Sequence, residues 1–149
     1  MDDELRLENF LPYRLAVLSN TVSTTVARAY DKRFNVSIPE WRVIAALGRF
    51  PGLSAVEVAG RTLMDKVAVS RAVTKLIKNG RIDRDFADAD KRRSILNLSE
   101  DGKQLHDEIA QLALEFERDL LQGFSTEEME NLNGIMERLL ARASLIGSP

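Results

Sequence analysis

The segment between Val58 and Gly102 constrains the fold of this chain more than any other part of it. Its residue pattern predicts a short helix, a turn, a second helix with a basic outer face, and then a short β-hairpin with a charged tip. A helix-turn-helix followed directly by such a hairpin is the layout of a winged helix that reads DNA. We therefore predict a winged helix-turn-helix DNA-binding region over residues 37–98.

The formal net charge is −2, but the charges are unevenly distributed along the chain. Residues 61–93 carry ten basic and five acidic side chains, whereas residues 94–149 carry four basic and eleven acidic ones. Positive charge gathered in one segment is typical of a surface that contacts phosphates. We therefore expect double-stranded DNA as a partner, with the basic segment as the surface that binds it.

The composition of the 149 residues argues against several other classes of protein. There is no cysteine and only one histidine, His106, so neither a zinc-thiolate site nor a site of several histidines is expected. No glycine-rich phosphate loop or Gly-x-Ser-x-Gly elbow is present, and we expect neither a cofactor nor an enzyme. The acidic start and the lack of an apolar run of about 20 residues predict a cytoplasmic protein without a membrane segment.

Apolar residues recur at three- and four-residue spacing at both ends of the chain, which predicts long amphipathic helices. One helix is expected from residue 5 to about residue 34, one from Ser99, and one from Ser125. With the hairpin, these helices give a mainly α fold that carries a small β-hairpin wing. Pro12 is expected in the first turn of its helix or at a bend that enters it.

We treat residues 1–149 as a single domain in which residues 1–34 and 99–149 form a helical dimerisation region. The apolar stripes of these helices exceed what a small winged helix can cover, so a monomer would expose a large apolar patch. A homodimer is therefore expected. The alternative is that the stripes close on one another within one chain.

Polar residues mark the ends of the central helices. Ser54 and Glu57 form a capping-box pattern, and Ser125 repeats it with Glu128 before the last helix. Asp65 is the expected N-cap of the second helix of the motif, and Gly80 is its expected C-terminal stop. The second helix should therefore run from about Lys66 to Asn79.

The helix from Lys66 to Asn79 has an apolar side and a basic side on a helical wheel. Val67 is an exposed valine among basic residues, which suits contact with a thymine methyl group, and Arg71 suits a forked contact with guanine. The alternative is an amphipathic surface helix with a solvated basic face. The residues expected to contact DNA from this helix are Lys66, Val67, Ala68, Ser70, Arg71, Thr74, Lys75 and Lys78.

The hairpin carries a second set of candidate DNA contacts. Arg92 and Arg93, with Lys91 beside them, are expected at the tip, where they suit a narrow minor groove. Asp90 is expected to hold Arg92 or Arg84 in position. The alternative is a charged turn whose mixed signs keep it solvated. The candidate wing residues are Arg84, Asp90, Lys91, Arg92 and Arg93.

Three stretches together resemble the MarR (multiple antibiotic resistance regulator) family. The run from Asp90 to Ser94, followed by the run from Leu96 to Gly102, is similar to the wing signature of that family. Asp65–Arg71 resembles the start of its recognition helix, and Ile38–Val43 resembles the opening of its second helix. The sequence departs from the family pattern at three places, which are Arg81, Ala87-Asp88 and Ser99.

The resemblance implies a cytoplasmic two-fold homodimer that binds a pseudo-palindromic operator and acts as a repressor. It also implies a small aromatic or anionic effector that releases the DNA, bound between the dimer helices and the winged helix. Arg14, Trp41 and Arg42 are the candidate ligand residues, although a tryptophan at this position is also typical of a core. A competing interpretation is a helical dimer that acts through protein partners, with the winged helix as a scaffold.

Overall fold

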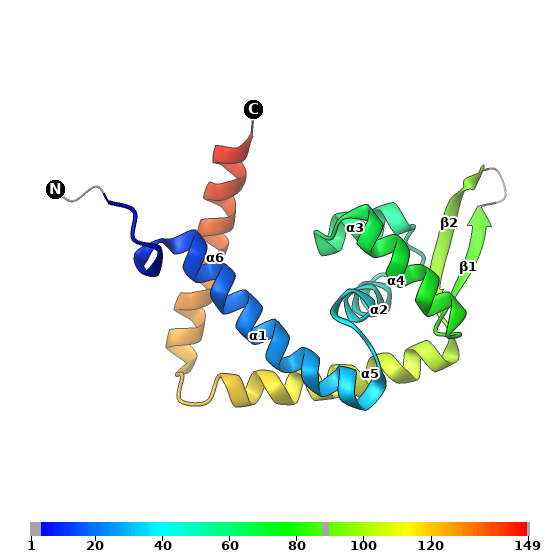
Figure 1. Ribbon diagram of the computed structural model, residues 1–149, viewed down its shortest axis with the longest axis horizontal. Helices are drawn as coiled ribbons and strands as arrows, with labels where there is room; N and C mark the ends of the chain where they lie inside the picture. The colour runs from blue at the N-terminus through cyan, green and yellow to red at the C-terminus, as the bar shows by residue number, and fades with distance from the viewer. Residues whose placement is uncertain (1–3, 88–89, 149) are drawn as a thin grey trace. The chain divides into compact units, whose positions relative to one another are not determined.

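The computed structural model describes residues 4–87 and 90–148, and for residues 87 and 90–92 it describes the backbone alone. A mainly α fold with one antiparallel hairpin is confirmed (Figure 1). The elements in chain order are a 3-10 turn at Leu7–Asn9, α1 (Leu11–Phe34), α2 (Ile38–Arg49), α3 (Ala55–Thr62), α4 (Lys66–Lys78), β1 (Ile82–Ala87), β2 (Asp90–Leu98), α5 (Glu100–Leu120) and α6 (Thr126–Gly147).

The first long helix begins six residues later than the sequence predicts. Phe10 has an extended backbone, and α1 starts at Leu11 with Pro12 in its first turn. The ring of a proline clashes with the carbonyl group four residues before it, so a regular helix cannot continue from residue 5 through Pro12. The 3-10 turn at Leu7–Asn9 occupies the interval instead.

Polar caps fix the starts of the following helices. Both predicted capping boxes are confirmed, at Ser54 for α3 and at Ser125 for α6. The carboxylate of Asp65 accepts a hydrogen bond from the backbone N–H of Ala68 at 2.8 Å, which confirms it as the N-cap of α4. A third box, in which Ser37 and Glu40 cap α2, escaped the sequence analysis.

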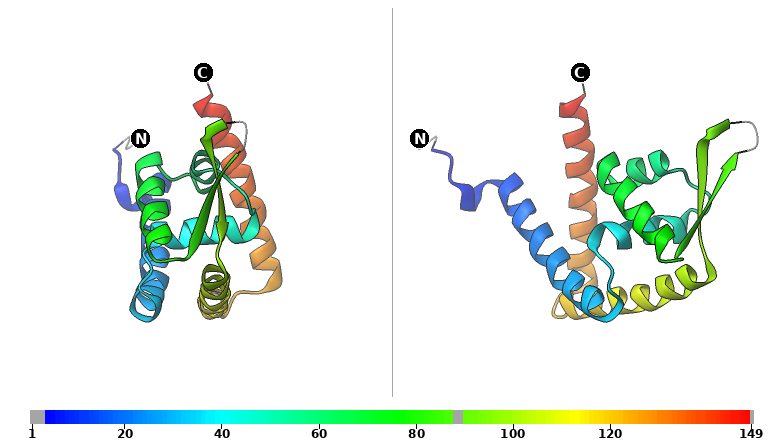
Figure 2. Two further views of the ribbon diagram at one scale, coloured as in Figure 1. Left: turned by 90° about the vertical axis from the view of Figure 1, so that its right-hand side faces the viewer. Right: turned by 45° about the vertical axis from the view of Figure 1, so that its right-hand side comes forward.

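Helices α2, α3 and α4 lie beside the hairpin (Figure 2), and the core is made of buried side chains from these elements. Tyr30 adds to it from α1, and Leu105 and Ile109 add to it from α5. Ile82 and Leu96, one from each strand, join the hairpin to this core. The buried apolar side chains of α4 hold one side of that helix against this core and leave its other side open to solvent.

The hairpin is longer than its apolar alternation predicts. Its register pairs Ile82 with Leu98 and Phe86 with Ser94, and then shifts so that Ala87 pairs with Asp90. The charged run from residue 90 to residue 93 therefore belongs to strand β2, and the prediction that it forms the tip is wrong. Backbone pairing can extend a strand beyond its alternating segment because an exposed hairpin needs no buried face there.

The chain divides into two compact units, of which the first ends at Leu114 and the second starts at Glu115. In the second unit, none of the residues of α6 is buried, although the helix carries a row of apolar side chains. Among the residues that the structure describes, no helix is both long and apolar enough to cross a membrane.

Candidate nucleic-acid interface

Helices α3 and α4 form the helix-turn-helix. The turn between them is short because Leu63 adopts a left-handed backbone conformation with φ 54° directly after α3. Asp65 then caps α4 two residues later. A left-handed residue ends a helix abruptly, since the next N–H group no longer continues the helical hydrogen-bond pattern. The tight turn leaves the second helix of the pair on the surface.

One side of α4 is buried and the opposite side faces solvent, as the helical wheel predicts. Val69 and Val73 belong to the core, whereas Val67 is 59% exposed. The buried members are Val69, Ala72, Val73 and Leu76, and the exposed candidates are Lys66, Val67, Ser70, Arg71, Thr74, Lys75 and Lys78, while Ala68 is half-buried.

The cations of the basic segment whose side chains the structure describes fall into two groups that the sequence does not separate. Those in the first group have partners within the chain, and Arg61, for example, stacks on the ring of Phe50 at 3.8 Å. Those in the second group form no ion pair or hydrogen bond among the described residues. The first group is Arg61, Lys75, Arg81 and Arg93, and the second is Lys66, Arg71, Lys78 and Arg84.

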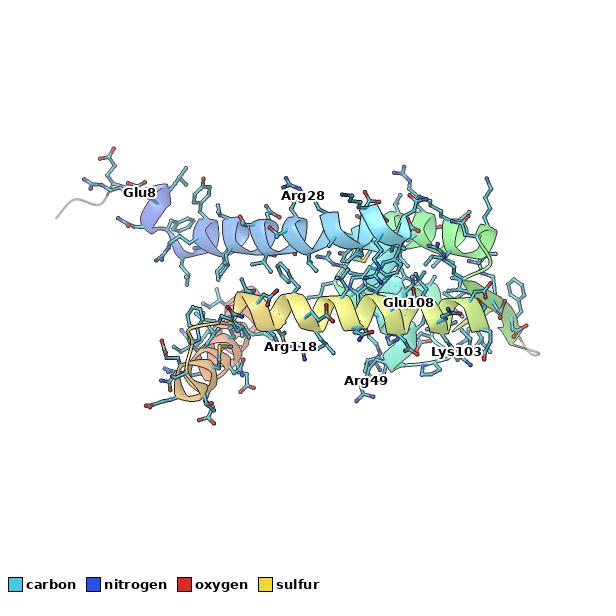
Figure 3. The ribbon with its side chains drawn as sticks, turned by 90° about the horizontal axis from the view of Figure 1, so that it is seen from below. Glu8, Arg28, Arg49, Lys103, Glu108 and Arg118 are labelled. Atoms are coloured by element: carbon cyan, nitrogen blue, oxygen red, sulfur yellow. The ribbon has the colours of Figure 1, made fainter. Side chains whose placement is uncertain are left out.

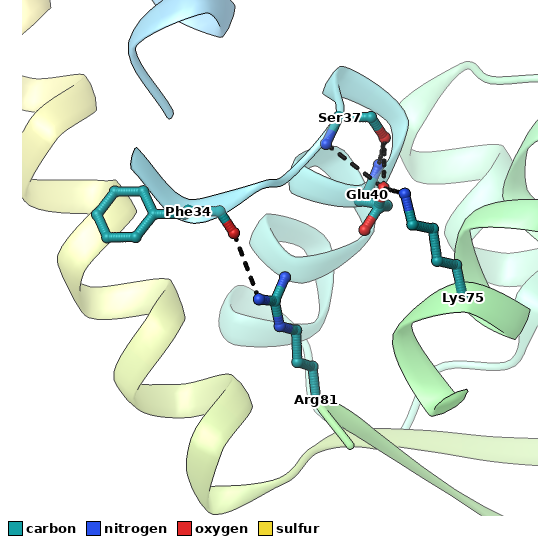
Figure 4. Close-up of polar contacts among 5 residues, drawn as sticks. All are labelled: Phe34, Ser37, Glu40, Lys75 and Arg81. Carbon is teal, nitrogen blue, oxygen red and sulfur yellow. Dashed lines mark hydrogen bonds and ion pairs between the residues drawn. The ribbon is translucent and has the colours of Figure 1, made fainter. Parts of the chain in front are cut away.

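Lys75 points towards α2 as well as towards solvent. Its Nζ lies 3.3 Å from Oε1 of Glu40, whose side chain is 2% exposed (Figure 4). The same Oε1 accepts a hydrogen bond from the hydroxyl group of Ser37 at 2.8 Å. Phosphate contact by Lys75 stays a prediction, and it would compete with this ion pair.

The candidate wing residues differ in their exposure and in their partners. Arg84 on β1 is exposed. Nη2 of Arg93 lies 3.5 Å from Oε1 of Glu57, in the first turn of α3, so this arginine folds back towards the helix-turn-helix. The side chains of Asp90, Lys91 and Arg92 lie outside the described residues, so their predicted roles stay predictions.

The carboxylate of Glu57 serves two purposes at once. It accepts a hydrogen bond from the backbone N–H of Ser54 at 3.2 Å, which caps α3, and it faces Arg93. The hydrogen bonds with Ser54 lower the pKa of Glu57 below its usual value, and the positive charge of Arg93 lowers it further. The cap of α3 and strand β2 of the wing are thus joined through one side chain.

Arg81 has a structural role that the sequence analysis missed. It occupies the turn between α4 and β1, and its Nη2 donates a hydrogen bond to the carbonyl oxygen of Phe34 at 3.3 Å (Figure 4). The carbonyl oxygen of Arg81 in turn accepts from the N–H of Ser99 at 3.0 Å. Its departure from the family pattern was the one available signal, because an arginine in place of an apolar residue needs polar partners.

The candidate ligand residues are not brought together within one chain. Trp41 is half-buried between Tyr30 and His106, with ring centroids 6.2 Å and 5.9 Å away. Arg14 lies sixteen residues before Tyr30 in the same helix α1, which is about 24 Å along a helix axis. Arg42 is exposed, and its charge offsets part of the rise that burial causes in the pKa of Tyr30.

A cavity of about 460 Å³ lies beside α5, next to Lys103, His106 and Asp107. In Figure 3, Lys103 and Arg49 lie on the side of α5 opposite to Arg28 of α1. The cavity has apolar walls and a few polar groups, among them Lys103, His106 and the amide of Asn97. Such a mixture is typical of a small-molecule site. The full lining is Leu47, Gly48, Pro51, Asn97, Leu98, Lys103, His106 and Asp107.

Comparison with known proteins identifies the family of the winged helix. Residues 34–93 match the model of the MarR family. The regulator BilQ of Clostridium symbiosum, an HTH-type transcriptional regulator, is 30% identical over 93 residues, which are 62% of this chain and 65% of that protein. The homoprotocatechuate degradative operon repressor of Escherichia coli is 23% identical over 76% of this chain and 77% of its own.

Solved structures extend the likeness to nearly the whole chain. A MarR/EmrR family transcriptional regulator from Acinetobacter sp. ADP1 matches 95% of this chain and 99% of its own, with a TM-score of 0.86 and 27% identity. The S. aureus MepR–DNA complex shares the fold over 89% of this chain and 98% of its own, with a TM-score of 0.82 and 19% identity. These relatives are transcriptional regulators, which bears out the expectation that the chain is no enzyme. In the sequence of its winged helix and in the fold of nearly its whole length, the chain resembles transcriptional regulators of the MarR family.

Proposed function

We propose that this chain is a sequence-specific DNA-binding regulator that acts as a homodimer on a pseudo-palindromic operator. One observation carries the proposal: α4 presents Val67, Arg71 and Lys78 to solvent on the side opposite its buried face. Val67 is 59% exposed, and Arg71 and Lys78 form no ion pair among the described residues. This surface suits a helix that enters a major groove, where a valine meets a thymine methyl group and an arginine grips guanine.

The wing supplies the second contact. The register of the hairpin places the exposed Arg84 on β1 opposite Leu96, which is buried in the core. A two-stranded ribbon that follows the recognition helix in the chain suits a minor groove next to the major groove that the helix enters. Arg93 joins this contact if phosphate competes with Glu57, and Arg92 is proposed from its sequence position alone.

A second copy of the chain is the proposed cover for the exposed apolar side chains of the terminal helices. Ile135 of α6 is 51% exposed, and Leu15 in α1 is similarly open. A lone chain would leave these surfaces in water, which is unfavourable for an apolar patch of this extent. Exposed apolar side chains in and beside these helices include Leu11, Leu15, Val17, Leu18, Leu114, Leu120, Phe124, Leu132, Ile135, Met136, Leu139, Leu140, Leu145 and Ile146.

Repression and its relief by a small ligand complete the proposal. The E. coli relative is named a repressor of a degradative operon, and the S. aureus structure is that of a complex with DNA, which supports the same activity here. For the effector we propose the cavity beside α5, where Lys103 and His106 offer polar contacts against the apolar Leu47 and Leu98. A small aromatic carboxylate suits these walls.

Affinity selection from a pool of random duplexes, followed by sequencing, tests this function. A dimer that uses two copies of α4 must select two inverted half-sites about 34–36 Å apart, which is one turn of B-DNA. Enrichment of a single half-site or of no sequence would contradict the proposal. The second outcome, combined with stable dimers, would favour a regulator that acts through protein partners.

A further inference from the structure

We infer that the buried Glu40 and the partly exposed Lys75 form a clamp that positions the recognition helix α4 on α2, and that Lys75 does not contact DNA phosphates. The inference rests on the proposed function, because it concerns how α4 is held for reading bases. Lys75 lies in the basic segment and on the side of α4 that includes Arg71, so its sequence position alone favours a phosphate contact. The structure assigns it a partner within the chain instead.

The burial of Glu40 is the first argument. Its side chain is 2% exposed, and among the residues that the structure describes no other charged residue is buried. Oε1 receives three donors, namely the Ser37 hydroxyl at 2.8 Å, the Ser37 N–H at 3.4 Å and Nζ of Lys75 at 3.3 Å. Oε2 is buried with no hydrogen-bond partner among the described residues. A carboxylate so poorly solvated depends strongly on its one cationic partner.

The position of Lys75 around the helix is the second argument. Successive residues of an α-helix turn by about 100°, so the buried Ala72 and the exposed Lys78 lie about 60° to either side of Lys75. Lys75 therefore stands at the border between the packed and the open side of α4. From there its long side chain reaches α2, as Figure 4 shows, whereas Lys78 has no acidic partner among the described residues.

The clamp has a consequence for base reading. Lys75 lies one turn after Arg71 on α4, so an ion pair at Lys75 limits rotation of the helix about its own axis and fixes where Arg71 points. Glu40 is itself fixed by the capping box with Ser37, at the point where α1 gives way to α2. Loss of the clamp should reduce the preference for one base sequence over another, while loss of a phosphate contact should lower the affinity for all duplexes alike.

Four variants test the inference, namely Lys75→Gln, Glu40→Gln, the double variant, and Lys78→Gln as the matched control. Glutamine at position 40 can still complete the capping box, so that substitution removes the charge and keeps the cap. Each protein is titrated with a labelled duplex from the selection and with a scrambled duplex of the same length, between about 50 and 200 mM KCl. Thermal unfolding of the same four proteins reports the strength of the clamp without DNA.

For Lys75→Gln we expect about a tenfold loss of preference for the selected duplex and no change in the slope of log affinity against log salt. For Lys78→Gln we expect equal losses on both duplexes and a slope shallower by about 0.9, as one phosphate contact requires. Glu40→Gln should lose preference as Lys75→Gln does, and the double variant should lose no more than either. In thermal unfolding, Lys75→Gln should lower the melting temperature because it leaves the buried Glu40 carboxylate without its cation. The double variant should melt at a higher temperature than Lys75→Gln, because glutamine at position 40 carries no charge.

A slope that falls by about 0.9 in Lys75→Gln would overturn the inference, because the lysine would then neutralise a phosphate. Independent, multiplying losses in the double variant would overturn it as well. If Lys75→Gln does not fold, the slope of log affinity against log salt is measured in the double variant instead. If the unaltered protein binds no duplex, the proposed function fails, while the unfolding measurements still decide whether the clamp exists.

Discussion

Arg93 on strand β2 forms an ion pair with Glu57 in the first turn of α3, with 3.5 Å between Nη2 and Oε1. The pair joins the wing to the helix-turn-helix across 36 residues of sequence. Both side chains are largely exposed, at 66% and 44%, so the pair itself adds little to stability. Its interest lies in the fact that Glu57 also caps α3.

The stabilisation of the folded state by the Glu57 carboxylate should be lost as the pH falls. The pKa of Glu57 is lowered in the folded state from its usual value of 4.5, chiefly by the hydrogen bonds with Ser54. A lowered pKa means that the unfolded state takes up the proton first, so the stabilisation is full above pH 4.5 and is lost as the pH falls through the folded value. The melting-temperature difference between the unaltered protein and Glu57→Gln should therefore shrink as the pH falls from about 6 to about 3. Glu115→Gln controls for the loss of an exposed charge, and a constant difference for Glu57→Gln would contradict the assignment.

Gly102 should tolerate no side chain. A Cβ atom there would collide with the backbone carbonyl oxygen of Arg81, because the first turn of α5 lies against that carbonyl group. We expect Gly102→Ala to lower the free energy of unfolding by about 1–3 kcal/mol, measured by urea denaturation. Gly60→Ala is the control, since nothing lies within 4 Å of the added atom and alanine favours a helix. Equal stabilities for the two variants would contradict the close contact.

The exposed face of α6 should be needed for dimer formation. Leu139→Glu places a charge on the side of the helix that carries Ile135, and we expect the variant to sediment as a 16.7 kDa monomer. Ser144→Glu adds the same charge about 180° around the helix from Ile135 and should leave the dimer intact. Analytical ultracentrifugation separates these outcomes. A monomeric unaltered protein, or a dimeric Leu139→Glu, would show that this face is not the interface.

The effector cavity should respond to Lys103. With salicylate as the probe, we expect release of a labelled duplex from the unaltered protein, and a roughly tenfold higher midpoint for Lys103→Gln because one charged hydrogen bond is lost. Arg14→Gln distinguishes the two proposed locations, since Arg14 lies about 24 Å along α1 from the residue that contacts Trp41. If Arg14→Gln raises the midpoint and Lys103→Gln does not, the site lies with the residues chosen from the sequence.

The features that sequence analysis predicts correctly are those set by short-range chemistry. The caps at Ser54, Asp65 and Ser125 depend on residues three positions apart, and the two sides of α4 follow from helical periodicity. The register shift after Phe86 has no such local signal, since the extra residues pair through backbone groups that every residue carries. The predicted hairpin is therefore too short.

Partner choice among the charged residues could not be predicted, because it depends on the tertiary fold. Lys75 and Lys78 are both lysines on the basic side of one helix, yet only the first reaches a buried carboxylate. That carboxylate, Glu40, is buried by the packing of α2 on α4, which no sequence window contains. Arg93 and Glu57 are likewise joined only because β2 returns past α3.

The salt dependence of duplex binding tests the central claim most directly. The unaltered protein, Arg71→Ala and Lys78→Ala are titrated with the selected duplex and with a scrambled one over the same range of salt. We predict a steep loss of affinity with salt for the unaltered protein, a loss of sequence preference in Arg71→Ala, and equal weakening on both duplexes in Lys78→Ala. A flat salt response, with preference unchanged in Arg71→Ala, would contradict a recognition helix at α4.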